Sequence, residues 1–210
     1  MRRTPPERGA PYFPIMQKAS QRSKGQSKGE WIVYRDAAPY PEVSGPADSD
    51  TVAMLKRDYA GSGGELSGIT QYVYQSIAAG GKDAVANEAG ANEAFANALL
   101  QIAIVEMMHL DMLGDAIVTL GGDPRFSDDQ QRYWTAADID YSRSLEDMVR
   151  ANVEAEETAI ANYQRHASHT DNKSVRELLL RIAEDEKLHL RFFRKMLKPS
   201  APMDDRYERT

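Results

Sequence analysis

The sequence predicts an all-α protein that folds as a four-helix bundle, with a long crossover between its second and third helices. Two observations predict this class. Apolar residues recur at helical spacing through most of residues 50 to 197. No stretch shows the alternation of Val, Ile and Thr with polar residues that marks a half-exposed strand. Amphipathic helices bury their apolar faces against one another, and a four-helix bundle is the simplest such packing.

Helix stop signals divide this region. Pro124 follows the second helix and Pro199 the fourth, while residues 122 to 142 show no helical period and form the crossover. A group of glycines should weaken the first helix: Gly61, Gly63 and Gly64. We therefore expect helices over four ranges, namely about 50–79, 90–120, 143–168 and 173–197.

Composition narrows the classes of function. The 210 residues suffice for one compact domain and a tail. Lys and Arg total 26 against 32 Asp and Glu, and this net charge of -6 disfavours a nucleic-acid partner. No apolar run approaches the roughly 20 residues of a membrane span. The absence of cysteine excludes disulfides, thiolate metal sites, iron–sulfur clusters and cysteine nucleophiles, so any metal must be held by oxygen and nitrogen.

The amino-terminal region differs from the rest. Residues 1 to 30 contain seven basic and two acidic residues, and the first 49 residues contain seven prolines. We interpret residues 1–49 as a basic, Pro-rich arm, 50–198 as the bundle and 199–210 as a tail. The arm is either solvated or docks onto a neighbouring subunit. It has no apolar run long enough for a secretory signal, so a cytoplasmic location is expected.

The second and fourth helices contain the first residues that indicate a chemical function. Each helix has an apolar seam that is interrupted by Glu-x-x-His, as Glu106 with His109 and Glu186 with His189. Residues three apart share one helical face, so each pair points into the same part of the core. Residues seven apart form two rows along each seam. In the second helix one row is Phe95, Ile102, His109 and Ala116, and the other is Leu99, Glu106, Leu113 and Leu120. In the fourth helix one row is Val175, Ile182, His189 and Met196, and the other is Leu179, Glu186 and Phe193.

The first and third helices each add one carboxylate. Glu65 is followed by Ile69 and Tyr72 at the same spacing as Ile160 and Tyr163 follow Glu156. The chain is therefore an internal two-fold repeat. The repeat also selects Glu156 as the inward residue, because its neighbours Glu154 and Glu157 lack this pattern and belong on the flanks.

Four buried carboxylates repel one another, so a positive charge must compensate them. Two divalent ions neutralise four glutamates, and two neutral histidines complete a dinuclear site. One Glu from each of two helices and Glu-x-x-His from each of the others is the known pattern of dinuclear carboxylate bundles. The oxygen-rich set suits manganese or iron better than zinc or copper. The predicted ligands are Glu65, Glu106, His109, Glu156, Glu186 and His189.

Two tyrosines and two histidines lie outside the predicted ligand set. Tyr72 and Tyr163 either pack as core aromatics or bond through their hydroxyls to the ligating carboxylates. His166 and His169 lie two turns or more from the metal layer, so we expect them to be surface or helix-end residues.

Four segments carry a resemblance to a known family: GSGGELSGITQYVYQS, IAIVEMMHLDMLGDAIVTLGGDPRF, VEAEETAIANYQRH and LLLRIAEDEKLHLRFF. Over residues 50 to 197 the chain resembles the manganese catalases, above all their short, spore-coat-associated branch. These belong to the ferritin-like superfamily, with rubrerythrins and bacterioferritins. The resemblance implies a ferritin-like bundle, two manganese ions and a homo-oligomer of hexameric size. It also implies a spore coat as an alternative location.

The resemblance also implies roles for the site residues. The equivalents of Glu65, Glu106, His109, Glu156 and His189 ligate manganese in that family, and the equivalent of Glu106 bridges the ions. The equivalent of Glu186 is an acid or base near bound solvent in manganese catalases and a direct ligand in diiron relatives. Both roles stay open for Glu186.

The expected activity is disproportionation of hydrogen peroxide to water and dioxygen. The two metal ions would cycle between M(II)M(II) and M(III)M(III), with Glu186 transferring the protons. One alternative is a diiron oxidase or peroxidase with two iron ions, although zero cysteines argue against the cysteine-ligated iron site of rubrerythrins. Another is a structural coat or shell protein that keeps metal only for stability.

Overall fold

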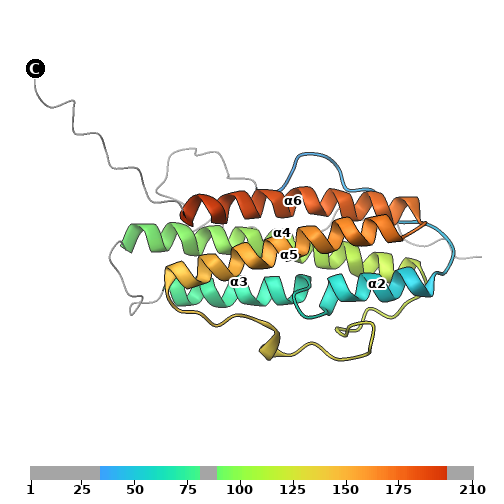
Figure 1. Ribbon diagram of the computed structural model, residues 1–210, viewed down its shortest axis with the longest axis horizontal. Coiled ribbons are helices and arrows are strands. Elements are labelled where there is room, and N and C mark those ends of the chain that lie inside the picture. Colours follow the sequence, from blue (N-terminus) through green and yellow to red (C-terminus); the bar gives the residue numbers. More distant parts are fainter. Residues whose placement is uncertain (1–33, 81–88, 198–210) are drawn as a thin grey trace, which may run out of the picture. The chain divides into compact units, whose positions relative to one another are not determined.

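The computed structural model describes residues 34–80 and 89–197 (Figure 1). Within these ranges the protein is helical, and its only β-type pairing is one isolated bridge between Ser127 and Tyr133. Helices α2 and α3 follow one another along one side of a four-helix bundle, and α4, α5 and α6 form the other three sides (Figure 1). The predicted class is confirmed. The helices are α2 (Ser49–Ala60), α3 (Glu65–Ala79), α4 (Ala89–Thr119), α5 (Leu145–His169) and α6 (Lys173–Leu197).

The prediction of a single helix over residues 50 to 79 is wrong, because the chain leaves the helical path between α2 and α3. Gly63 adopts a φ of +76°, a conformation that favours glycine. Gly64 runs so close to α2 that a Cβ atom would lie 2.5 Å from the Asp58 carbonyl oxygen. The glycines therefore do more than weaken the helix, since they permit a tight break that places α3 next to the core.

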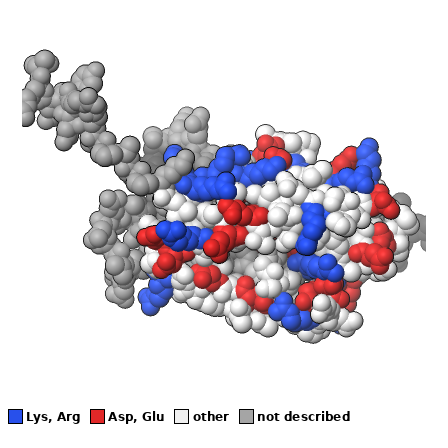
Figure 2. Space-filling model, viewed as in Figure 1, with Lys and Arg blue, Asp and Glu red and all other residues white. Residues whose placement is uncertain are grey.

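The other predicted helix limits agree with the structure to within two residues. Ser144 caps α5 by accepting a hydrogen bond from Asp147 N, and Gly121, at a φ of +84°, follows the end of α4. Basic side chains gather over the carboxyl-terminal part of α6, where they complement the helix dipole (Figure 2).

The crossover between α4 and α5 runs beside α2 and α3, as Figure 1 shows. It includes a short 3-10 helix, Ala136–Asp138. Its polar contacts fix it there: Trp134 Nε1 donates to Ser67 Oγ at 3.0 Å, and Asp140 N donates to Gln71 Oε1 at 2.8 Å. The crossover thus lies near the break between α2 and α3.

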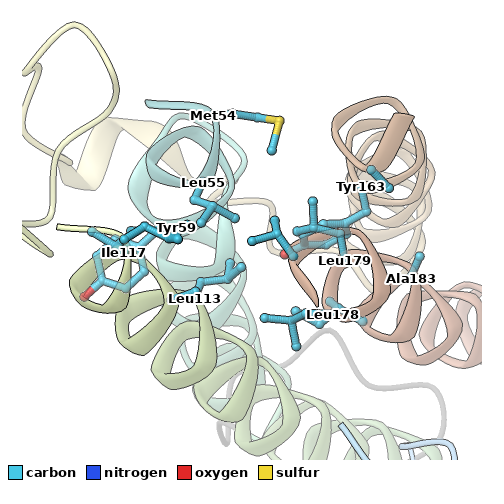
Figure 3. Packing of buried hydrophobic residues seen from close by; sticks show 14 of the residues in the cluster. Met54, Leu55, Tyr59, Leu113, Ile117, Tyr163, Leu178, Leu179 and Ala183 are labelled. Carbon is cyan, nitrogen blue, oxygen red and sulfur yellow. The ribbon is translucent and has the colours of Figure 1, made fainter. Parts of the chain in front are cut away.

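The core consists of two apolar clusters with a polar layer between them. One cluster unites α2 with α4, α5 and α6, and Figure 3 shows Leu55, Leu113 and Leu179 directed toward one another within it. The other is centred on Phe95, Leu99 and other residues of α3, α4, α5 and α6. The heptad rows predicted for α4 and α6 are buried, with Met196 packed at the edge. The predicted Glu and His residues therefore lie midway between the clusters.

Residues 34–40, which we call the strap, lie against α6. Arg181 of α6 donates to the carbonyl oxygens of Ala38 and Asp36 at 2.8 and 2.7 Å. Residues 1–33 of the predicted arm and the whole predicted tail, 199–210, lie outside the described residues. The proposed limits of arm, bundle and tail remain predictions. None of the helices within the described ranges is long and apolar enough to cross a membrane.

Candidate metal centre

The structure brings all six predicted ligands together in the polar layer of the core. Each of the four bundle sides contributes, and the six residues are between 0 and 6% exposed. The flanking Glu154 and Glu157 are exposed on α5, so the repeat pattern selected the buried glutamate correctly. The contributions are Glu65 from α3, Glu106 and His109 from α4, Glu156 from α5, and Glu186 and His189 from α6.

The six residues form two overlapping groups, and in each group the ligand atoms lie within 4.8 Å of one another. Glu106 and Glu186 belong to both groups. The first group adds Glu65 and His109, and the second adds Glu156 and His189. Each group thus contains one imidazole and three carboxylates, a set that could hold a metal ion.

The two shared carboxylates face both histidines. Glu106 places Oε2 at 3.1 Å from His109 Nδ1 and Oε1 at 3.0 Å from His189 Nδ1. Glu186 places Oε1 at 3.0 Å from His109 Nδ1 and Oε2 at 2.9 Å from His189 Nδ1. Each shared carboxylate therefore turns one oxygen toward each group, which is the arrangement that bridging of two ions requires.

Within this cluster, positive charge can come only from protons that its own side chains bind. Burial raises the pKa of Glu65 and of Glu156 well above the usual range, and neighbouring carboxylates add to this. Burial alone would lower the pKa of His109, but Glu186 and Glu65 raise it well above the usual value. His189 behaves likewise beside Glu106 and Glu156. The cluster therefore favours bound positive charge at the histidine Nδ1 atoms.

The donor set fits divalent ions. Glu186 Oε1 is buried and has no hydrogen-bond partner among the described residues, although it lies 3.0 Å from His109 Nδ1. Burial would raise the pKa of Glu186, but the imidazoles of His109 and His189 hold it below the usual range. A buried ionised oxygen without a donor calls for a cation. Two divalent ions would balance the four carboxylates and replace the protons on both imidazoles.

Each of the two buried tyrosines donates a hydrogen bond to a glutamate in the other half of the repeat. The Tyr72 hydroxyl of α3 donates to Glu156 Oε1 of α5, and the Tyr163 hydroxyl of α5 donates to Glu65 Oε1 of α3. Burial raises the pKa of both tyrosines well above the usual value, so they remain neutral donors. Of the two alternatives, bonding to the carboxylates is therefore what the structure shows. Each hydroxyl thus bonds to a glutamate that belongs to only one of the two ligand groups.

Comparison with known proteins adds the family. The family model described as rubrerythrin matches residues 83–197, which is more than half of the chain. The chain belongs to the rubrerythrin family. The match includes both Glu-x-x-His motifs and the glutamate of α5, and the ferritin-like fold that the resemblance implied is confirmed. No curated protein matches this rubrerythrin-family chain.

Solved structures show the same fold. A crystal structure of wild-type KatB, a manganese catalase from Anabaena, is 26% identical, with 78% of each chain covered and a TM-score of 0.65. A second KatB structure, from Anabaena PCC7120, is 24% identical, covers 82% of this chain and 87% of that chain, and has a TM-score of 0.65. Mycobacterial bacterioferritin is 21% identical over 73% of this chain and 86% of that chain, with a TM-score of 0.58. The spore-coat-associated branch stays a prediction.

The hydrogen-bond partners of the two histidine Nε2 atoms were not predicted, and these partners differ between the halves of this rubrerythrin-family protein. His109 Nε2 lies 3.1 Å from Asp185 Oδ2, whereas His189 Nε2 lies 2.8 Å from the carbonyl oxygen of Tyr34 in the strap. Because Asp185 Oδ2 and the Tyr34 carbonyl oxygen are both acceptors, Nε2 carries a hydrogen and donates in both cases. A usable signal was present, since Asp185 directly precedes Glu186 while Val105 holds the equivalent position in α4.

Asp185 is itself firmly held. It accepts from Arg181 Nη1 at 2.8 Å, from the Tyr40 hydroxyl at 2.5 Å and from Asp36 N at 2.5 Å. Although burial would raise the pKa of Asp185, these donors and His109 hold it below the usual value. The strap and α6 therefore keep an ionised carboxylate behind one of the two histidines.

His166 lies in the last turn of α5, as the helix-end alternative predicted, but it is not at the surface. His166 is buried, and its Nδ1 lies 2.7 Å from Oδ2 of Asp58, which is also buried. The reason is that α2 packs over the last turns of α5 and supplies a carboxylate there. His169, in contrast, is exposed at the end of α5, as predicted.

Proposed function

We propose that the protein is a dinuclear manganese catalase, which converts two molecules of hydrogen peroxide into two of water and one of dioxygen. The observation that carries this proposal is the pair of buried ligand groups that share Glu106 and Glu186. The likeness to a manganese catalase at 26% identity supports it. Two manganese ions bound there would supply the one-electron couples that both halves of the reaction need.

The residue content supports a self-contained reaction. Peroxide is the oxidant in one half and the reductant in the other, so disproportionation needs no further electron donor. The sequence contains no cysteine that could ligate an electron-transfer iron site. Glu65 and Glu156 would each bind one ion, and the hydroxyls of Tyr163 and Tyr72 would keep these carboxylates in place.

Glu186 is the residue we assign to proton transfer. Its Oε1 is buried, lacks a hydrogen-bond donor and lines a cavity that reaches the ligand set. Because Glu186 is ionised and this oxygen has no other donor, it is placed to take a proton from peroxide and return it. Its position in both groups also favours a role as a bridging ligand.

The proposed function is tested by loading the metal-free protein with manganese and measuring peroxide consumption and dioxygen release together. We expect two manganese ions per chain and one dioxygen for every two peroxides consumed. The same measurement on iron-loaded protein serves as the comparison. A protein that keeps two manganese ions yet releases no dioxygen would contradict the proposal.

One observation favours a second candidate, a diiron oxidase or peroxidase. Glu186 lies in both ligand groups, which is the position of a direct ligand as the diiron relatives have it. Iron-loaded protein would then consume peroxide without releasing dioxygen and would stop once its ferrous ions are oxidised. Turnover with manganese would exclude this candidate as the main activity.

The unequal partners of the two histidines predict unequal binding of the two ions. Asp185→Asn should weaken the ion beside His109 by about 10–100-fold, because an outer carboxylate that supports a ligating histidine contributes this much. The ion beside His189 should bind as before, because Tyr34 supports that histidine. Calorimetric titration of metal-free protein with Mn²⁺ resolves the two sites. Asp115→Asn, an exposed change on α4, is the control, and equal weakening of both ions would be the contrary result.

The oligomeric state and the spore-coat location are expected from the resemblance, and the cytoplasmic location from the lack of a secretory apolar run. A homo-oligomer of hexameric size and a cytoplasmic or spore-coat location stay predictions. Sedimentation of the purified protein would test the first, and fractionation of cells and spores the second.

A further inference from the structure

A cavity of about 80 Å³ leads from the surface to the candidate metal centre. Its outer end is lined by the exposed Arg57 and by Asp138 of the crossover. Its inner end is lined by Glu106, Glu156 and Glu186. Glu186, which is 1% exposed, presents there the carboxylate whose Oε1 lacks a hydrogen-bond partner. The cavity is thus a route from solvent to an atom that is unpaired within the described residues.

The cavity lies between α3 and α5. Each of these helices packs mainly along another neighbour, α3 along α4 and α5 along α6, and they make few direct contacts with each other. Gln71 and Tyr72 of α3 and Asn162 and Tyr163 of α5 line the gap together with small residues, namely Gly68 on α3 and Ala155 and Ala159 on α5. At the positions of these small residues, neither helix fills the gap with more than a methyl group.

Gly64 is explained by the break between α2 and α3, where a Cβ atom would collide with the Asp58 carbonyl oxygen at 2.5 Å. Gly68 has no such explanation. It lies in the interior of α3 with helical backbone, and glycine is the least favourable residue there apart from proline. A Cβ atom at position 68 would meet only Glu106 Cγ and Tyr72 Cε2, each at an ordinary contact distance of 3.9 Å. What a side chain would remove is the empty space in front of Glu106.

We infer that Gly68 keeps open the path by which substrate reaches the ions. This inference rests on the proposed function. A cavity of about 80 Å³ has room for several water-sized molecules. Hydrogen peroxide has two heavy atoms and fits.

The test uses azide, a small anion that binds metal ions without turnover. Cobalt(II)-loaded wild-type protein and the variants Gly68→Ala and Gly68→Val are mixed with azide, and the change in visible absorption is followed in time. We expect Gly68→Ala to slow azide association by about tenfold or more, since one added carbon changes a tight pocket this much. Gly68→Val should slow it further. Both variants should retain two ions per chain.

Stability should move in the opposite direction. Because alanine suits a helix interior better than glycine, Gly68→Ala should raise the melting temperature by about 2–4 °C. Gly114→Ala is the matched control, because Gly114 lies in the interior of α4 and does not line the cavity. Its azide rate should equal that of the wild type. If Gly68→Val fails to bind metal, Gly68→Ala decides alone, because its Cβ meets no close contact.

Two results would overturn the inference: unchanged azide rates in both Gly68 variants, or no azide binding to the loaded wild type. The azide measurement is independent of the proposed function. If the protein releases no dioxygen but its azide rates follow the size of residue 68, the proposed activity is refuted and the inference about the path stands.

Discussion

Glu106→Gln should leave the protein with almost no bound metal, whereas Glu65→Gln should cost it one of two ions. Glu106 turns one carboxylate oxygen toward each histidine and belongs to both ligand groups, while Glu65 belongs to one. Loss of the shared charge therefore weakens both ions at once. Outer partners of a ligand alone contribute about 10–100-fold to metal affinity, so loss of a ligand itself should exceed this. Glu156→Gln should lose the other ion.

Elemental analysis after dialysis against dilute manganese counts the ions in each variant. Glu154→Gln is the matched control, because Glu154 lies two residues before Glu156 on the exposed face of α5. It should keep two ions and full peroxide turnover. Two ions in Glu106→Gln, or an equal loss in all variants including the control, would refute the assignment of shared and single ligands.

The same series separates the two roles of Glu186. If Glu186 bridges the ions, Glu186→Gln resembles Glu106→Gln and loses both. If Glu186 instead serves proton transfer beside bound solvent, Glu186→Gln keeps two ions and loses turnover. The positions of its two oxygens, one near each histidine, lead us to expect the first result.

The metal-free protein should lose stability as the pH rises above neutrality, and the manganese-loaded protein should not. The pKa values of Glu65, Glu156, His109 and His189 are all raised well above the usual range in the fold. The folded state then binds more protons than the unfolded state. Its stability therefore falls with increasing pH, from the ordinary glutamate value of 4.5 and the histidine value of 6.5 upward.

Bound manganese reverses this trend, because the metal replaces the protons and its affinity increases as the ligands ionise. Each ion should add about 2.7 kcal/mol to the free energy of unfolding at a free concentration of 100 times its dissociation constant. Thermal unfolding between about pH 6 and about pH 9, with and without manganese, measures both effects. The double variant Glu65→Gln/Glu156→Gln is the control, since its amides stay neutral and should flatten the metal-free curve. Constant or increasing metal-free stability over this range would contradict the prediction.

The sequence alone could predict the parts of the centre that follow from helical spacing. Glu106 and His109 share a heptad seam with Leu99 and Ile102, so their inward direction follows from the apolar residues around them. The same argument applies to Glu186 and His189. Glu156 could be chosen over its neighbours because the repeat supplied a second copy of the pattern. These inferences needed only the geometry of one helix at a time.

Contacts between distant segments could not be predicted in this way. The spacing left open whether the Tyr72 and Tyr163 hydroxyls bond to carboxylates, and it could not show that each bonds to the glutamate of the other helix. The strap reaches His189 from 155 residues away, through a backbone carbonyl that has no sequence signature. The break between α2 and α3 depended on how closely Gly64 approaches Asp58, which spacing does not reveal.

The crossed tyrosines have a consequence for how the two halves of the repeat depend on each other. Each half supplies a hydroxyl that keeps one carboxylate of the other half in place, and the two shared glutamates come one from each half. Neither half contains a complete ligand group. Two separate halves could therefore not form the candidate centre, and this centre marks the seam along which the halves are interlocked.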